Sequence, residues 1–95
     1  EAAIHGFDGF VLPIIPGVSA CYECLHPEQR PKPSMIPVLG ATAGVIGSMQ
    51  AGLAIRQLAG LDIEHGVMTQ FSLVTMETAR AALKRRPGCP ACGHL

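Results

Sequence analysis

The stretches CYEC at residues 21–24 and GCPACG at residues 88–93 decide how this chain folds, because each contains a C-x-x-C pair. Together the two pairs contain all four cysteines of the chain: Cys21, Cys24, Cys89 and Cys92. A tetrahedral Zn²⁺ ion takes four thiolate ligands, and the two-residue gap within each pair brings both of its sulfur atoms to one metal. We therefore predict a closed, structural zinc site with these four ligands. Gly93 is expected to adopt a left-handed turn that directs backbone N–H groups at the sulfurs.

Two other interpretations of the cysteines remain open. A redox-active C-x-x-C pair belongs in a thioredoxin-like setting, and it would leave the second pair without a role. Two disulfides would require an oxidising compartment, but the sequence carries no secretion signal, so a cytoplasmic location is expected. Residues 25–88 between the pairs are also a far longer stretch than a zinc ribbon contains. The zinc site would therefore join two distant segments of one domain.

Other chemistry-bearing residues give weaker signals. The four histidines share no metal-ligand spacing and are expected to be surface or packing residues: His5, His26, His65 and His94. Arg85 and Arg86 follow Lys84 in a short basic run, which is more typical of a solvated strand end than of a binding patch. The sequence has no complete phosphate-binding loop and no nucleophile elbow. We therefore predict no catalytic and no cofactor-binding residue among these residues.

The composition restricts the class of protein. The chain has 95 residues, of which 48% are hydrophobic and 15% are charged, and its formal net charge is zero. Such a chain is one domain or part of one, and it is too hydrophobic to be disordered. Because it has no basic excess and only 4% aromatic residues, we expect no nucleic-acid partner and no binding to an anionic membrane.

The longest regular segment is predicted to be a helix over residues 42–59. Its pattern is apolar on every side, so we expect the helix to be buried on most of its surface. Small residues form one stripe that would let a sheet or a second helix come close: Ala43, Gly47, Ala51 and Ala54. The uncharged run from Val38 to Ile55 also resembles a membrane span, but glycines and polar residues dilute its hydrophobicity. We favour the helix of a soluble domain.

Short β-type runs lie on both sides of this helix. Residues 2–5 and 10–15 are predicted to be two strands, or one bent strand. Residues 67–75 alternate between two faces and are predicted to be a strand. Residues 78–84 favour a helix by propensity and a returning strand by position. Residues 21–37 contain four prolines, so we expect an extended loop there with no helix.

In this order the segments resemble the C-terminal half of the ThiF/MoeB/HesA family, the prokaryotic relatives of ubiquitin-activating enzymes. The matching motifs extend over nearly the whole chain: GFDG at 6–9, IIPG at 14–17, CYECL at 21–25, PVLGATAGVIGSMQA at 37–51 and RRPGCPACG at 85–93. The resemblance implies an α/β fold, namely the C-terminal part of a ThiF-type Rossmann-like domain. It would have mixed or antiparallel strands, one long buried helix and the four-cysteine zinc site.

The resemblance also implies how the chain is divided. Residues 25–37 would form a crossover loop, residues 42–59 the helix and residues 85–95 a zinc-knuckle tail. Residues 67–84 would form a β-hairpin, so the ambiguous segment within them is expected to be a strand despite its propensity.

An activity follows from the same resemblance. Proteins of this family use ATP and Mg²⁺ to adenylate the C-terminal glycine of a small ubiquitin-like sulfur carrier, in thiamine- or molybdopterin-type sulfur transfer. Their ATP-binding residues lie in the N-terminal half. The chain is therefore expected to be a fragment that is not active alone, and ATP and Mg²⁺ would bind only the full-length protein. The implied partners are the Gly-Gly tail of the carrier, threaded under residues 25–37, and a second copy in a full-length homodimer.

One feature departs from the family pattern. Some members carry a reactive cysteine in the crossover loop, whereas residues 25–37 contain none here. This favours an adenylation-only branch, or a member whose reactive thiol lies elsewhere. The alternative is a non-catalytic, zinc-stabilised protein-binding module or a degenerate family member.

Overall fold

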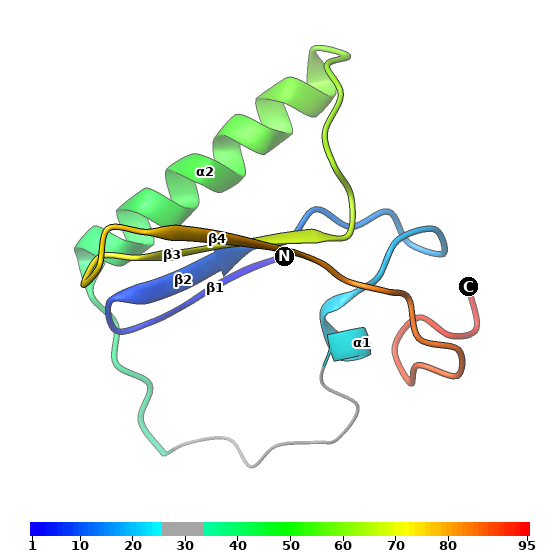
Figure 1. The fold of residues 1–95 in the computed structure, drawn as a ribbon, viewed down its shortest axis with the longest axis horizontal. Helices are drawn as coiled ribbons and strands as arrows, with labels where there is room; N and C mark the ends of the chain where they lie inside the picture. Colours follow the sequence, from blue (N-terminus) through cyan, green and yellow to red (C-terminus); the bar gives the residue numbers. More distant parts are fainter. Residues whose placement is uncertain (26–33) are drawn as a thin grey trace.

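The structure is a computed structural model that describes residues 1–25 and 34–95 (Figure 1). These residues contain β1 (Ala2–His5), β2 (Asp8–Val11), α1 (Tyr22–Leu25), α2 (Gly40–Leu58), β3 (Val67–Ser72) and β4 (Thr78–Ala82). The strands form one antiparallel sheet of order β1-β2-β3-β4. Figure 1 shows α2 across one face of this sheet and α1 on the other side. The expected α/β class is confirmed, and the described strands are antiparallel rather than mixed.

The first two strands form a tight hairpin. Gly6 takes a φ of 60° in the turn between them, a conformation that is costly for residues with a Cβ. The hairpin excludes a single bent strand. The second strand covers Asp8–Val11 rather than residues 10–15. It ends before Pro13 because proline cannot donate a hydrogen bond to a sheet ladder.

The second hairpin follows its position rather than its propensity. β4 is a strand over Thr78–Ala82, although alanine and arginine in this segment favour a helix. Pairing with β3 therefore overrides local propensity. β3 stops at Ser72 rather than continuing to residue 75, because the reversal begins there. Met76 N–H donates a hydrogen bond to Ser72 O at 2.8 Å, and Met76 has a φ of 59°.

α2 packs on the sheet through its N-terminal half. Ile46 is 3% exposed and lies against Gly9 of β2, where an added Cβ would come within 2.5 Å of Ile46 Cγ1. Thr42 is fully buried, and its hydroxyl donates a hydrogen bond to Gly6 O at 2.8 Å. The absence of a side chain on Gly9 thus allows the helix to approach the strand closely.

The burial of α2 differs from the prediction. The helix covers Gly40–Leu58 rather than residues 42–59, and its only buried residues are Thr42 and Ile46. The small residues of the predicted contact stripe are all exposed: Ala43, Gly47, Ala51 and Ala54. Burial on most sides is therefore wrong for the described chain, because the sheet offers α2 one contact face and the other described residues leave the rest uncovered. No helix in residues 1–25 or 34–95 is long and apolar enough to cross a membrane.

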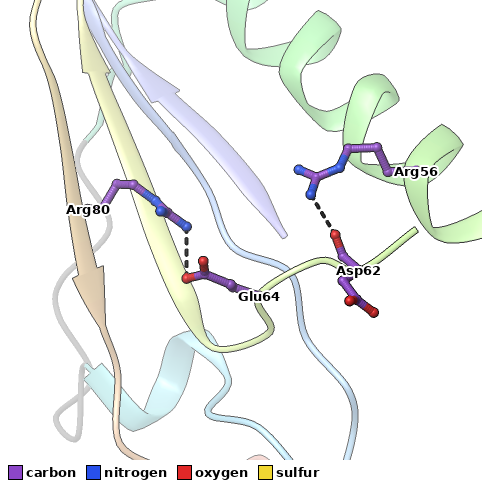
Figure 2. Close-up of polar contacts among 4 residues, drawn as sticks. All are labelled: Arg56, Asp62, Glu64 and Arg80. Carbon is purple, nitrogen blue, oxygen red and sulfur yellow. Dashed lines mark hydrogen bonds and ion pairs between the residues drawn. The ribbon is translucent and has the colours of Figure 1, made fainter. Parts of the chain in front are cut away.

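Polar contacts hold the connection from α2 to β3 (Figure 2). Arg56 donates a hydrogen bond to Asp62 O at 2.5 Å, and Arg80 of β4 forms an ion pair with Glu64 at 3.0 Å. The side chains of the ion pair are 55% and 66% exposed, so it contributes about 0–1 kcal/mol. These contacts direct the path of the connection between helix and sheet.

The first cysteine pair overlaps a short helix that was not expected from the sequence, and Cys24 lies within this helix. An extended loop without a helix over residues 21–37 is wrong at its start, because Tyr22–Leu25 forms α1. Cys24 N–H donates to Cys21 O at 3.1 Å, and the first proline of the segment comes only at Pro27, beyond this turn. Residues 26–33 lie outside the described residues, so most of the expected crossover loop does as well.

Candidate metal centre

The segment after β2 brings the first cysteine pair to its place. Ile15 O accepts hydrogen bonds from the N–H groups of Val18 and Ser19, both at 3.0 Å, and the Ser19 hydroxyl accepts one from Ile15 N–H at 2.8 Å. These bonds close a turn of the kind that serine hydroxyls stabilise. The buried Ala20 follows the turn and packs directly against the cysteines.

The chain after β4 brings the second pair to the same place. Leu83 N–H donates a hydrogen bond to Gly66 O at 2.8 Å, and the Leu83 side chain packs on the cysteine cluster. Cys89 N–H then donates to Arg86 O at 3.1 Å, and Gly93 N–H donates to Cys89 O at 2.8 Å. These bonds wind the tail into successive tight turns next to α1.

The four thiols lie within reach of a single ion. Their Sγ atoms are all within 4.8 Å of one another, with separations of 3.8 Å for Cys21–Cys24, 3.7 Å for Cys21–Cys89 and 3.5 Å for Cys24–Cys92. Metal–sulfur bonds of about 2.3 Å in a tetrahedron require sulfur separations of roughly 3.8 Å. The observed separations fit this requirement, and all four cysteines are free. The sequence predicted this convergence, and the four residues can hold one metal ion.

Burial and backbone hydrogen bonds separate the pKa values of the thiols. Burial raises the pKa of Cys21 to about 12. Burial also disfavours the thiolate of Cys24, but hydrogen bonds to its sulfur have the larger combined effect and lower the pKa of Cys24 to about 6. The largest contribution among these hydrogen bonds comes from Arg86 N–H, at 3.4 Å. The N–H of Cys92 lowers the pKa of Cys89. Cys24 and Cys89 thus lose their protons more readily than Cys21, and a binding metal ion would displace the proton of Cys21.

Gly93 is needed for space rather than for a left-handed turn. The left-handed conformation belongs to Gly88, with a φ of 73°, and not to Gly93. A Cβ on Gly93 would lie 2.6 Å from both the backbone N and the backbone O of Cys89. The expected left-handed turn is therefore wrong. Glycine is required here because two backbone segments of the second pair approach each other closely.

We expect Gly93→Ala to disrupt the second cysteine pair. The clashing atoms belong to the backbone of Cys89, which cannot shift without moving its thiol, so the substitution would lower the free energy of unfolding by about 1–3 kcal/mol or more. Thermal unfolding of the metal-loaded chain measures this loss. Gly52→Ala is the matched control, because its Cβ meets nothing within 4 Å and removing a helical glycine gains about 1 kcal/mol. Equal melting temperatures for Gly93→Ala and wild type would contradict the clash.

The described histidines do not belong to the cysteine cluster. His5 and His94 are exposed, and Nε2 of His65 is buried with no hydrogen-bond partner among the described residues. In the described ranges the metal-ligand cluster contains cysteines alone. His26 lies outside these ranges.

Arg85 is a functional candidate that the sequence did not distinguish. It is expected in a solvated basic run, but its guanidinium donates hydrogen bonds to the backbone oxygens of Gly17, Cys92 and Leu95 at 2.6, 2.7 and 2.7 Å. Its acceptors are backbone atoms from two separate segments. Because every residue type has a backbone oxygen, the acceptors of Arg85 leave no pattern in the sequence. The sequence therefore gives no reason to assign a role to Arg85 rather than to Arg86.

A cleft of ≈ 590 Å³ lies on the face of the sheet opposite α2. Phe10 of β2 and Tyr22 of α1 stack at this cleft, with ring centroids 5.4 Å apart and 1° between the ring planes. Ile36 lines it from the segment that leads to α2, and Gln70 and Ser72 line it from β3. The cleft thus combines an aromatic wall with polar groups, which is typical of a binding surface.

Comparison with known proteins agrees with this arrangement. The sequence model of the ThiF family matches residues 1–91. The chain belongs to the ThiF family. This ThiF-family chain is 34% identical over 96 residues to the sulfur carrier protein ThiS adenylyltransferase of Escherichia coli strain K12, an alignment that covers 97% of the chain and 38% of that relative. It is 35% identical over 101 residues to protein HesA of Nostoc sp., covering 99% of the chain and 38% of that relative.

More distant relatives of this ThiF-family chain are longer still. The adenylyltransferase and sulfurtransferase MOCS3 of Sus scrofa is 32% identical over 101 residues, which is 99% of the chain and 22% of that protein. Among solved structures, the heterocyclase TruD matches with a TM-score of 0.54 and 21% sequence identity, over 93% of this chain and 17% of that chain. This last likeness shows a shared fold alone. The chain spans well under half the length of each of these proteins.

Proposed function

We infer that this ThiF-family chain is the C-terminal part of an ATP-dependent adenylyltransferase. It would activate the C-terminal glycine of a ubiquitin-like sulfur carrier for thiamine- or molybdopterin-type sulfur transfer. The observation that carries this inference is the similarity over 97% of the chain to the sulfur carrier protein ThiS adenylyltransferase. Because the chain covers 38% of that relative, ATP and Mg²⁺ would bind in the longer protein. The free thiols suit a reducing cytoplasm, which is the location we propose.

Zinc is the metal that we assign to the cysteine cluster. Four soft thiolates with no open coordination position suit a structural Zn²⁺, because a catalytic zinc keeps one position for water. The contact from Arg86 N–H to Cys24 Sγ, at 3.4 Å, is the kind of outer-shell hydrogen bond that orients a metal ligand. Zinc bound here would join the tail after β4 to α1. It would thereby hold the start of the proposed crossover loop.

The cleft supports a role in guiding the tail of the carrier. The proposed crossover loop, residues 25–37, starts beside the metal centre and ends where Gly6 N–H donates a hydrogen bond to Pro37 O at 2.9 Å. Gly6 and Val38 also form a parallel bridge. These two attachment points lie toward opposite ends of the sheet, as can be followed in Figure 1. A tail of two glycines carries no side chains, so it can pass beneath such a loop and bind through its backbone.

The proposed chemistry is the formation of an acyl-adenylate. A carboxylate oxygen of the carrier tail attacks the α-phosphorus of ATP, the bond to the β-phosphate oxygen breaks and pyrophosphate leaves. The resulting mixed anhydride is an electrophile that sulfur can attack. Residues of this chain would hold and orient the tail, whereas the groups that bind phosphate and Mg²⁺ belong to the longer protein.

The open face of α2 fits a chain that packs against further protein. Besides the exposed small residues, Ile55 and Leu58 are apolar and are 66% and 89% exposed. Apolar patches of this kind mark interaction surfaces in soluble proteins. We propose that the rest of the longer protein covers this face, and that the full-length protein is the homodimer that the family resemblance implies.

ATP–pyrophosphate exchange is the test of this function. We expect the longer gene product that contains these residues to exchange labelled pyrophosphate into ATP when its carrier is present, because adenylation is reversible. We expect the 95-residue chain alone to give no exchange above the buffer. A carrier without its two terminal glycines is the matched control and should remove the exchange.

Two outcomes would change the proposal. Exchange by the chain alone would contradict the assignment of the ATP-binding residues to the longer protein. Binding of the carrier without exchange, in the longer protein, would favour the non-catalytic, zinc-stabilised binding module or the degenerate family member.

A further inference from the structure

The geometry points to Arg85 as a positioning residue of the metal centre that holds the two cysteine pairs in register. Its Nη1 donates a hydrogen bond to Gly17 O at 2.6 Å, and its Nη2 donates to Cys92 O and Leu95 O, both at 2.7 Å. Gly17 belongs to the segment that leads to the first pair, and Cys92 provides a thiol of the second pair. One guanidinium therefore joins the two segments that carry the four thiols.

The three acceptors explain why an arginine suits this position. The carbonyl dipoles of Gly17 and Cys92 repel each other where they converge, and a partly buried carbonyl needs a donor in place of water. A guanidinium is planar and permanently charged, and it offers five donors in a fixed fork. Hydrogen bonds from a charged donor are roughly twice as strong as neutral ones. Lysine carries the same charge without the fork, so it cannot reproduce this set of contacts.

Arg85 acts on the metal site through the backbone of Cys92. It holds the carbonyl of that residue, whose Sγ lies 3.5 Å from Cys24 Sγ. Leu95 N–H also donates to Cys92 O, at 3.1 Å, so this carbonyl belongs to a closed turn that contacts the guanidinium. Hydrogen bonds that orient a ligand residue typically change metal affinity by about 10–100-fold.

Arg86 offers a matched comparison within the same chain. It has the same charge and, like Arg85, is partly buried. Its contribution to the site is the backbone N–H that donates to Cys24 Sγ at 3.4 Å, while its side chain makes no hydrogen bond to the described residues. Changing the Arg86 side chain keeps that N–H. If variants at the two positions differ in metal affinity, the difference comes from the hydrogen bonds of the Arg85 guanidinium and not from the loss of a positive charge.

The test is a titration of the 95-residue chain with Co²⁺, followed by competition with Zn²⁺, for wild type, R85Q, R85K and R86Q. We expect R85Q to weaken the affinity for both ions by about 10–100-fold. The metal affinity of R85K should be closer to that of R85Q than to that of wild type, and the metal affinity of R86Q should equal that of wild type. At saturating Co²⁺, R85Q should also change the ligand-field absorption bands, because a relaxed second pair distorts the tetrahedron. Unchanged affinity and bands in R85Q would overturn the proposal.

A merely structural role for Arg85 has a different signature. It would lower the melting temperature of the metal-loaded form and leave the ligand-field bands at saturating Co²⁺ as in wild type, whereas a positioning role changes these bands because the second pair relaxes. If R85Q does not fold, the metal affinity of R85K is the test. A metal affinity of R85K equal to that of wild type would overturn the proposal that the branched hydrogen bonding of Arg85 positions the site.

This inference rests on the metal site of the proposed function and is independent of adenylation. A wild-type chain that binds neither ion would refute the site itself. Equal metal affinities in wild type and R85Q would refute the role of Arg85 but not the metal site.

Discussion

Removal of zinc by a strong chelator is expected to abolish the cooperative thermal unfolding of the chain. Apparent zinc-binding free energies in small domains are about 10–16 kcal/mol, which equals or exceeds the ~5–15 kcal/mol that stabilises a whole domain. The loss would be large here because Ala20 and three of the cysteines form a buried cluster of their own, and these cysteines would hold the proposed ion. Circular dichroism during heating, with and without chelator, measures the effect. Elemental analysis should find a single zinc ion per chain.

Cys92→Ser tests the same site without a chelator. Serine has nearly the same shape, but its hydroxyl replaces a thiolate ligand, so we expect most of the metal-dependent stability to be lost. His94→Ala is the control, because His94 is exposed and close to Cys92 in sequence but lies outside the cysteine cluster. A folded wild-type chain with no zinc and four reactive thiols would overturn the ligand assignment.

Ile46→Ala is expected to detach much of α2 from the sheet. The Ile46 side chain is 3% exposed and fills the space over Gly9. Truncation of a buried isoleucine to alanine costs about 2–5 kcal/mol. The helix has little to replace this contact, since Thr42 is its one other buried residue. Urea denaturation followed by circular dichroism measures the change in the free energy of unfolding.

Ile55→Ala is the matched control for this experiment. It is the same substitution in the same helix, but Ile55 is 66% exposed, so the expected change is within about 0.5 kcal/mol. Equal losses for the two variants would show that α2 uses a different contact face. In the longer protein, a larger loss at Ile55 than in this chain would support the proposal that further chain covers the open face of α2.

The convergence of the cysteines could be predicted from the sequence, but the contacts that orient them could not. A C-x-x-C pair is a local pattern whose chemistry requires its thiols to meet a common partner. Arg85 and Gly93 have no such pattern. Arg85 acts on carbonyl groups, and Gly93 is needed because its Cα lies close to the backbone of Cys89. Both requirements depend on the path of the backbone, which residue types near the site do not reveal.

For α2 and β4, too, the sequence predicted some features and not others. Periodicity predicted the helix close to its observed range of Gly40–Leu58, but it could not predict the buried face, because burial depends on what else packs there. Propensity favoured a helix over Thr78–Ala82, and the strand arises from pairing with β3. The family resemblance predicted this strand, whereas the residues themselves left both possibilities open.

The separation of the two cysteine pairs also determines when in folding the metal can bind. Thiols that meet at the site, such as those of Cys24 and Cys92, are 68 residues apart in the sequence. Contacts across such a distance require the closure of a long loop and therefore form late. The hairpins β1–β2 and β3–β4 join neighbouring segments and can form first. An ion held by all four thiols therefore cannot nucleate folding. On the ribosome, the site would stay incomplete until Cys92 has been synthesised, and binding of the ion would mark the completion of the fold.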